Sequence, residues 1–325
     1  CAMNNNKIKI GIAGLGTVGS GVINLLAKNK AEILKRSGFE ISIVCVSANN
    51  KDKKRDCNID GLNFYTSPLE MIRNENFDIL IELIGGEGLA KKLVLEALKK
   101  KIHVVTANKA LIALHGNEIS EISNKEGCDV AYEASVAGAV PIIKVIRESL
   151  NANEIEWVAG IINGTTNYIL TEMLKSKKGF NDVLKEAQDL GYAEADPAFD
   201  VGGIDAAHKL TILASICFGI PLNFESIYIE GIEGIELDDL NYAKELGYAI
   251  KHLAIGRKNK NGIELRVHSC LIPKTRLLAN VDGVKNAVVV SSDAAGPTLY
   301  YGAGAGSLAT ASSVVSDIID ISRKI

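Results

Sequence analysis

The 325-residue sequence predicts an α/β fold in which a parallel-sheet domain is followed by an α+β domain. Strand-like and helix-like segments alternate over residues 8–132, a pattern typical of parallel sheets with right-handed crossovers. After residue 137 the alternation ends, and helices follow one another between strands. Hydrophobic residues make up 47% of the chain and charged residues 23%, which excludes a disordered protein and suits about two domains.

Apolar runs and helical spacing place the elements of both domains. In the first domain we expect strands at 8–13, 41–46, 79–84, 103–106 and 130–132, and helices at 18–34 and 89–98. In the second we expect strands at 154–162, 263–272 and 287–291, and helices at 166–175, 181–190 and 204–218. A glycine cluster and an amphipathic helix end the chain. The predicted domains are 1–137, completed by 302–325, and 138–301.

Composition excludes several functional classes. A net charge of −3 argues against a protein that binds nucleic acid by neutralising phosphates. The longest apolar run, 201–220, carries Asp205, His208 and Lys209, which a membrane helix would bury at high cost. The six cysteines form no CxxC pair, as is typical of reduced thiols in a cytoplasmic protein. The polar start predicts no signal peptide, and Cys1 is assigned no function.

A glycine-rich loop predicts a dinucleotide site. Residues 14–19 fit G-x-G-x-x-G, follow a predicted strand and open a predicted helix, as a Rossmann-type domain requires. Gly14 permits a tight turn, Gly16 lets the backbone approach a pyrophosphate, and Gly19 allows close packing of helix on strand. Thr17 and Val18 begin the helix, whose free N–H groups would face the phosphates.

The end of the second predicted strand bears on the choice of cofactor. NAD-specific domains place an acidic residue there for the ribose hydroxyls. Here Ser47, Ala48 and Asn49 end the strand, Glu40 precedes it, and Asp52 lies among Lys51, Lys53, Lys54 and Arg55. Small polar groups followed by cations favour the extra phosphate of NADP, while NAD stays possible.

The segment 191–209 carries four carboxylates and leads into an apolar helix. Asp205 and Lys209 stand four residues apart and therefore share one helix face. Their neighbours are apolar, and a buried charge is costly unless it is paired. The pair is either an ion pair that holds two domains in register or a site. In a site, Asp205 would bind a substrate ammonium and Lys209 would exchange a proton in carbonyl–alcohol chemistry.

Three other stretches have two readings each. Lys109 follows the strand 103–106 and either faces the nucleotide crevice or lies on the surface at a helix start. Residues 163–167 (NGTTN) offer N–H groups and hydroxyls to a ligand, or form a helix cap. The backbone carbonyls of residues 132–141 could surround a cation, or the stretch is a hinge between domains.

Together these segments resemble the homoserine dehydrogenase family. The resemblance rests on the 14–19 loop, on 106–109 (TANK), 132–134 (YEA), 163–167, 191–209 and the glycines of 302–306, in order along the chain. It implies NAD(P)-dependent interconversion of L-homoserine and L-aspartate 4-semialdehyde in threonine, methionine and isoleucine biosynthesis. It also implies a dimer built on the second domain. From the composition we expect no nucleic-acid or membrane partners.

The resemblance implies residue roles as well. Lys209 is the proton donor and acceptor, and Lys109 assists between nicotinamide and substrate. The implied substrate-binding residues are Glu194, Asp205, Asp200, Tyr192 and Thr165. The implied cofactor contacts are Gly14, Gly16, Thr17, Val18, Gly19, Ser47, Lys109, Gly191, Gly304 and Gly306. A monovalent cation such as Na⁺ is implied on the backbone of Glu133, Val136, Gly138 and Val140.

One departure from the family and two alternative functions also need to be considered. The chain ends at Ile325, so we expect no regulatory ACT domain and no direct threonine feedback through one. An aspartate semialdehyde dehydrogenase would share the substrate but needs an activated cysteine, and neither Cys128 nor Cys217 has a suitable context. A dinucleotide sensor without turnover would not need Asp205 and Lys209 buried together, and would usually carry a DNA-binding module.

Overall fold

The computed structural model describes residues 6–325, so Cys1 lies outside the described part. The chain divides into two compact units. Of the described residues, unit 1 comprises 6–139 and Ala305–Ile325, and unit 2 comprises Val140–Gly304. Among residues 6–325, no helix is long and apolar enough to cross a membrane.

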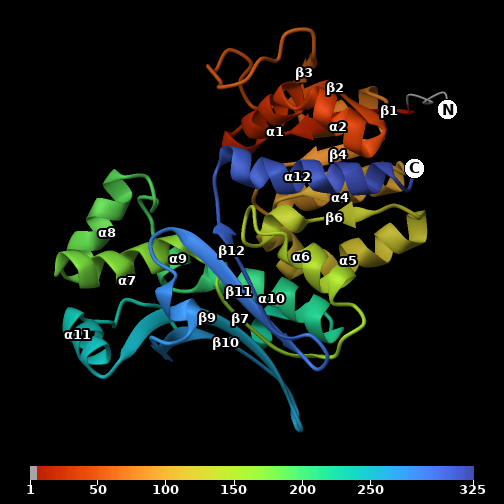
Figure 1. Cartoon of the computed structure of the whole chain (residues 1–325). Coiled ribbons are helices and arrows are strands. Elements are labelled where there is room, and N and C mark those ends of the chain that lie inside the picture. Colours follow the sequence, from red (N-terminus) through yellow and green to blue (C-terminus); the bar gives the residue numbers. More distant parts are fainter. Residues whose placement is uncertain (1–5) are drawn as a thin grey trace. The chain divides into compact units, whose positions relative to one another are not determined.

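Unit 1 contains a six-stranded parallel sheet in the order β3-β2-β1-β4-β5-β6 (Figure 1). Its strands are β1 (Asn6–Ala13), β2 (Phe39–Ser47), β3 (Asn63–Tyr65), β4 (Ile79–Glu82), β5 (His103–Thr106) and β6 (Val130–Ala131). This is the strand order of a Rossmann fold, in which ligands bind beyond the carboxyl ends of the strands. The predicted fold class is confirmed.

The helices of unit 1 differ from the prediction, which included no helix over 68–74 or 109–126 and a single one over 18–34. They are α1 (Thr17–Lys28), α2 (Lys30–Ser37), α3 (Pro68–Asn74), α4 (Gly88–Lys99), α5 (Lys109–Glu126) and α12 (Ser307–Ser322). The single helix expected at 18–34 is two helices. The Asn29 N–H bonds the Leu25 carbonyl and ends α1, while the Asn29 carbonyl accepts from Ile33 in α2. The apolar spacing continues across this joint, so periodicity alone could not reveal it.

The last helix, α12, packs against α1 (Figure 1). Val22, Ile23 and Leu26 of α1 share a buried core with Ala311 and Val314 of α12. The Ser307 hydroxyl donates to the Thr17 carbonyl at 2.8 Å. The C-terminal segment therefore fixes the helix that begins at the glycine loop.

Unit 2 is built on a mixed six-stranded sheet in the order β12-β11-β7-β9-β10-β8. Its strands are β7 (Ile155–Ile161), β8 (Tyr228–Ile229), β9 (Tyr248–Asn259), β10 (Gly262–Pro273), β11 (Lys285–Ser292) and β12 (Gly296–Ala303). The sequence prediction missed β9, because Lys251 and His252 interrupt its apolar residues. Both side chains are nevertheless buried, and the Lys251 ammonium pairs with Asp282 at 2.8 Å.

The helices of unit 2 are α6 (Ile142–Lys144), α7 (Gly164–Ser176), α8 (Phe180–Asp189), α9 (Ala198–Val201), α10 (Ile204–Phe218) and α11 (Leu237–Glu245). Helix α10 has the predicted bounds. Gly203 and Gly219 flank it in left-handed conformations that glycine adopts readily. The helix packs on the sheet, where its Phe218 ring lies against Gly256 of β9.

The contact between α1 and α12 yields a stability prediction. A Cβ at Gly21 would lie 2.5 Å from the Ser307 carbonyl oxygen, closer than real contacts allow. We expect Gly21→Ala to lower the free energy of unfolding by about 1–3 kcal/mol, the usual cost of overpacking. Urea unfolding of the variant and of the wild type measures this difference in free energy. The control is Gly88→Ala, because a Cβ at that helical glycine meets nothing within 4 Å. Equal stability of the two variants would contradict the packing argument.

Candidate active site

The predicted dinucleotide loop lies at the carboxyl edge of the parallel sheet. Gly14 follows β1 with φ +103°, and its N–H bonds the Ser47 carbonyl at the end of β2. A Cβ at Gly14 would lie 2.4 Å from the Leu83 carbonyl oxygen, and one at Gly19 would lie 2.1 Å from the Gly14 carbonyl oxygen. A Cβ at Gly16 would meet nothing within 4 Å. Packing thus requires two of the glycines, and the third leaves an open backbone that suits a pyrophosphate.

The loop after β2 holds the cations predicted for a 2′-phosphate. Ser47 is buried at the strand end, and Lys51, Lys53 and Lys54 are exposed. Arg55 is used internally: its guanidinium donates to the carbonyls of Asn50, Lys51 and Lys53, and it lies 5.8 Å from the centre of the Phe64 ring.

Glu40 lies near the start of β2, at the opposite end of that strand from the loop. Lys30 pairs with it at 3.0 Å, and the hydrogen bond from that ammonium lowers the pKa of the Glu40 carboxyl. Glu40 is therefore not the acid that would hold a ribose.

A buried acid at the end of β4 escaped the sequence analysis. The Glu82 side chain is fully buried and accepts from the Thr106 hydroxyl at 2.5 Å and from the N–H groups of Ile84 and Gly85 at 2.9 and 3.2 Å. Burial raises the pKa of its carboxyl, and these hydrogen bonds oppose that shift. Glu82 thus ties the ends of β4 and β5 together beside the predicted nucleotide site. Glu82 is the only charged residue in the apolar run 79–84. A charge inside a predicted buried strand was the signal that could have identified it.

Lys109 stands just after the end of β5. It is the first residue of α5, and the preceding Asn108 caps that helix by accepting from the Leu111 N–H. The Asn108 amide also donates to the Gly86 carbonyl at 2.6 Å, which holds the glycine pair after β4. Lys109 is half-buried at the carboxyl edge of the parallel sheet.

Unit 2 contains the predicted ion pair. Lys209 Nζ lies 2.7 Å from Asp205 Oδ2 and donates to the Ile162 carbonyl, also at 2.7 Å. The side chains are only 12% and 3% exposed. Helix α10 supplies both charges from one face, and the chain just after β7 supplies the carbonyl. Such a buried pair is stable only with this degree of hydrogen bonding.

Asn163 joins this pair to a second carboxylate. Its Nδ2 donates to Asp205 Oδ2 and to Asp200 Oδ1, both at 2.8 Å. Its Oδ1 accepts from the Thr166 N–H and so caps α7. The Thr165 hydroxyl donates to the Tyr192 carbonyl at 2.7 Å and lies 3.4 Å from Asp200 Oδ2.

Four of the five residues implied for substrate binding therefore gather with Lys209: Asp205, Asp200, Thr165 and, through its backbone, Tyr192. Glu194 is exposed between α8 and α9, where its carbonyl accepts from the Gln188 amide at 3.0 Å.

The glycines implied for cofactor contact have different surroundings. Gly191 has φ +76° and open space where a Cβ would stand. A Cβ at Gly304 would lie against the amide of the buried Asn286 side chain, which would have to move to admit it. Gly306, with φ +133°, precedes α12 in unit 1.

The stretch implied for a cation has an uncommon backbone. Ala137 and Gly138 adopt left-handed conformations in succession. The Gly138 carbonyl accepts from the Ser313 hydroxyl at 2.7 Å, and the Val140 carbonyl from the Ile142 N–H at 2.8 Å. Glu133 is buried, and its N–H donates to Asp317. Within residues 6–325, no group of three His, Cys, Asp or Glu side chains could hold a metal ion.

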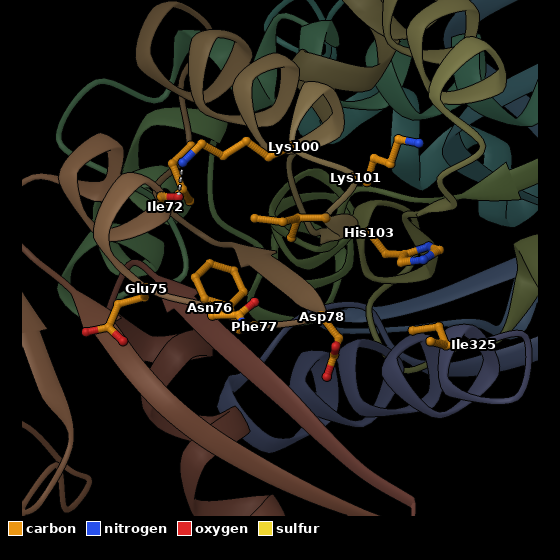
Figure 2. A pocket seen from close by; sticks show the side chains of 10 residues that line it. Ile72, Glu75, Asn76, Phe77, Asp78, Lys100, Lys101, His103 and Ile325 are labelled. Carbon is orange, nitrogen blue, oxygen red and sulfur yellow. Dashed lines mark hydrogen bonds between the residues drawn. The ribbon is translucent and has the colours of Figure 1, made fainter.

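A cavity of about 500 Å³ lies at the opposite edge of the parallel sheet (Figure 2). Asp78 and His103 line it at the amino ends of β4 and β5, where open α/β sheets do not bind their ligands. Figure 2 shows the Lys100 ammonium bonded to the Ile72 carbonyl. We therefore assign this cavity no part in the site.

Cys128 and Cys217 do not suit nucleophilic catalysis. Burial raises the pKa of the Cys217 thiol to about 12 and also raises the pKa of the Cys128 thiol. A catalytic cysteine needs a lowered pKa. This argues against the aspartate semialdehyde dehydrogenase reading.

Comparison with known proteins identifies the family. The family described as "Homoserine dehydrogenase" matches residues 141–319, and "Homoserine dehydrogenase, NAD binding domain" matches residues 14–133. The chain belongs to the homoserine dehydrogenase family. The homoserine dehydrogenase of Pseudomonas aeruginosa is 56% identical over 97% of this chain and 72% of its own length. That of Neisseria gonorrhoeae is 53% identical over the same shares.

Solved structures of homoserine dehydrogenases are also similar to this chain. The homoserine dehydrogenase of Thiobacillus denitrificans has a TM-score of 0.95 at 55% identity, over 98% of this chain and 74% of its own. A hyperthermophilic archaeal homoserine dehydrogenase in complex with NADPH has a TM-score of 0.84 at 28% identity, over 98% of both chains. The chain is therefore an oxidoreductase with homoserine dehydrogenase function, as the resemblance implied, and neither alternative is favoured.

The raised pKa of Glu82 predicts a pH-dependent stability difference. Below the ordinary value of 4.5 the carboxyl is protonated in both folded and unfolded chains. As pH rises from there to the raised folded value, only the unfolded chain ionises freely, so the folded state loses stability. Relative to Glu82→Gln, we expect the wild type to lose about 1.4 kcal/mol of unfolding free energy for each pH unit of that interval. Urea unfolding of both proteins from pH 4 to 8 measures this, and a pH-independent difference would refute it.

Proposed function

We propose that Lys209 exchanges the proton of the reacting oxygen when L-homoserine and L-aspartate 4-semialdehyde interconvert. The buried pair with Asp205 supports this role, since two hydrogen bonds hold the ammonium in one place. In the reductive direction Lys209 gives a proton to the aldehyde oxygen, and in the oxidative direction it takes the hydroxyl proton. When bound, the nicotinamide supplies or accepts the hydride at the carbon.

We assign the remaining roles as the family resemblance implies them. Asp205 and Glu194 bind the substrate ammonium, while Asp200, Thr165 and Tyr192 complete the pocket. Lys109, at the carboxyl edge of the parallel sheet, acts on the same oxygen as Lys209 and lies between substrate and nicotinamide. Two cations near one oxygen would stabilise the negative charge that develops there.

We propose NADP as the preferred cofactor, with NAD also accepted. The open backbone at Gly16 would hold the pyrophosphate together with the N-terminus of α1, that is Thr17 and Val18. Ser47 and the exposed lysines after β2 would face the 2′-phosphate. The NADPH complex of the archaeal relative supports this choice.

A monovalent cation on the backbone of Glu133, Val136, Gly138 and Val140 is part of the proposal. Successive left-handed residues at 137 and 138 support it, because such strained backbone is found mainly where a ligand or function needs it. Activity measured in Na⁺, in K⁺ and with choline as the only cation tests it.

We also propose a homodimer built on unit 2, in the cytoplasm, acting in threonine, methionine and isoleucine biosynthesis. Large apolar side chains of unit 2 are exposed, with Leu246 at 74% and Leu277 at 71%. Trp157 and Leu299 line an apolar cavity of about 570 Å³ beside Leu277. The free cysteines suit a reducing compartment. Sedimentation at micromolar concentration tests the dimer.

Substitution of Lys209 tests the proton-transfer role. Lys209→Ala removes the acid but leaves Asp205 buried without its ion-pair partner. Lys209→Arg keeps a positive charge that does not give up its proton. We expect both variants to lose at least about 100-fold in kcat for homoserine oxidation, the usual share of acid–base catalysis. Thermal melting of each variant reports whether the fold survives. Near-normal turnover of the arginine variant would contradict the proposed proton-transfer role of Lys209.

Substitution of the three exposed lysines after β2 tests the proposed preference for NADP. We expect the triple variant Lys51→Ala, Lys53→Ala, Lys54→Ala to raise KM for NADP by on the order of tenfold or more, since each exposed charge pair contributes up to about 1 kcal/mol. KM for NAD should not change, which makes NAD the internal control. A hundredfold preference of the wild type for NAD, or an equal change with both cofactors, would overturn the proposal.

A further inference from the structure

Asn163 occupies the junction where β7 ends and α7 begins, and its amide is fully used. The side chain is 4% exposed. Its two N–H groups go to two different carboxylates, Asp205 and Asp200, and its oxygen accepts from the Thr166 N–H. An asparagine amide has two donors and one acceptor oxygen, so each part has a partner here.

The same junction controls both members of the ion pair. The carbonyl of Ile162 accepts from Lys209 Nζ, and the next residue, Asn163, donates to Asp205 Oδ2. Lys209 Nζ and Asn163 Nδ2 therefore meet at a single carboxylate oxygen. Two donors on one oxygen restrict rotation of the carboxylate about its last bond.

Asp200 and Asp205 carry like charges, and a shared donor lets them stay close. One N–H of Asn163 stabilises the charged form of each carboxylate. An aspartate at position 163 would have nearly the same shape and would still cap α7, yet it would put a third carboxylate against the other two. A serine would cap α7 but is too short to replace both N–H donors.

We propose that Asn163 is a positioning residue for homoserine: it orients Asp205 beside Lys209 and holds Asp200 and Asp205 together through one amide group. The inference rests on the proposed role of Asp205 in binding the substrate ammonium. Loss of the amide should therefore affect the binding of homoserine more than that of the dinucleotide.

The experiment compares Asn163→Asp and Asn163→Ser with the wild type. We expect KM for homoserine to rise about ten- to a hundredfold, the range for a hydrogen bond to a charged group, with KM for NADP unchanged. The acid limb of the kcat/KM profile against pH should move to higher pH, because a carboxylate that loses a donor is protonated more easily. Asn163→Ser carries the test if the aspartate variant does not fold. The control is Ser67→Ala, which removes the cap of α3 in unit 1 and should leave the kinetics unchanged.

A double-mutant cycle with Asp205→Ala separates positioning from general damage. If Asn163 acts mainly through Asp205, adding Asn163→Ser to Asp205→Ala should raise KM several-fold less than it does in the wild type, with the remaining effect passing through Asp200. Multiplied effects, or folded single variants with unchanged KM and pH profile, would overturn the inference. An unchanged KM in Asp205→Ala alone would instead overturn the proposed function of Asp205, so the two failures are distinguishable.

Discussion

The buried pair of Asp205 and Lys209 is the constraint on which the arrangement of unit 2 depends. Helix α10 is apolar on nearly every side, and it still carries two opposite charges on one face. Charges that have left water need partners in the correct places, or burial costs several kcal/mol. The Ile162 carbonyl and the Asn163 amide provide these partners. The end of β7, the start of α7 and the first turns of α10 must therefore hold fixed positions relative to one another.

In unit 1 the corresponding constraint comes from backbone packed against backbone. Gly14 and Gly19 are glycines because a Cβ would overlap a carbonyl oxygen, and Glu82 holds the neighbouring strand ends from within. At Gly16, in contrast, a Cβ would meet nothing within 4 Å, so packing does not require glycine there. In unit 2 the space beside Gly304 is filled by a side chain, the buried Asn286 amide, which a Cβ would displace. A glycine in a motif thus has either a packing reason or a ligand reason, and only atomic surroundings separate the two.

The sequence predicted the elements whose local signals agree with their burial. Helix α10 has an apolar period and a glycine at each end, and its bounds match the prediction. Strand β9 was missed because Lys251, a charged residue, is buried by pairing with Asp282, a partner 31 residues away. Glu82 was missed for a partly similar reason: one of its three hydrogen bonds comes from Thr106 of β5, 24 residues away. Local patterns cannot show that a distant residue makes a buried charge tolerable.

Asn163 shows why a choice between helix cap and ligand site is too simple. As a cap, the side chain uses its oxygen, and as a positioning residue it uses its nitrogen. The two uses do not compete, because they engage opposite ends of one planar amide. Since the plane is rigid, the first turn of α7 and the carboxylate of Asp205 cannot shift independently. Helix capping thereby contributes to the geometry of the site, and a residue that looks structural from its sequence position acts on the reaction through its neighbours.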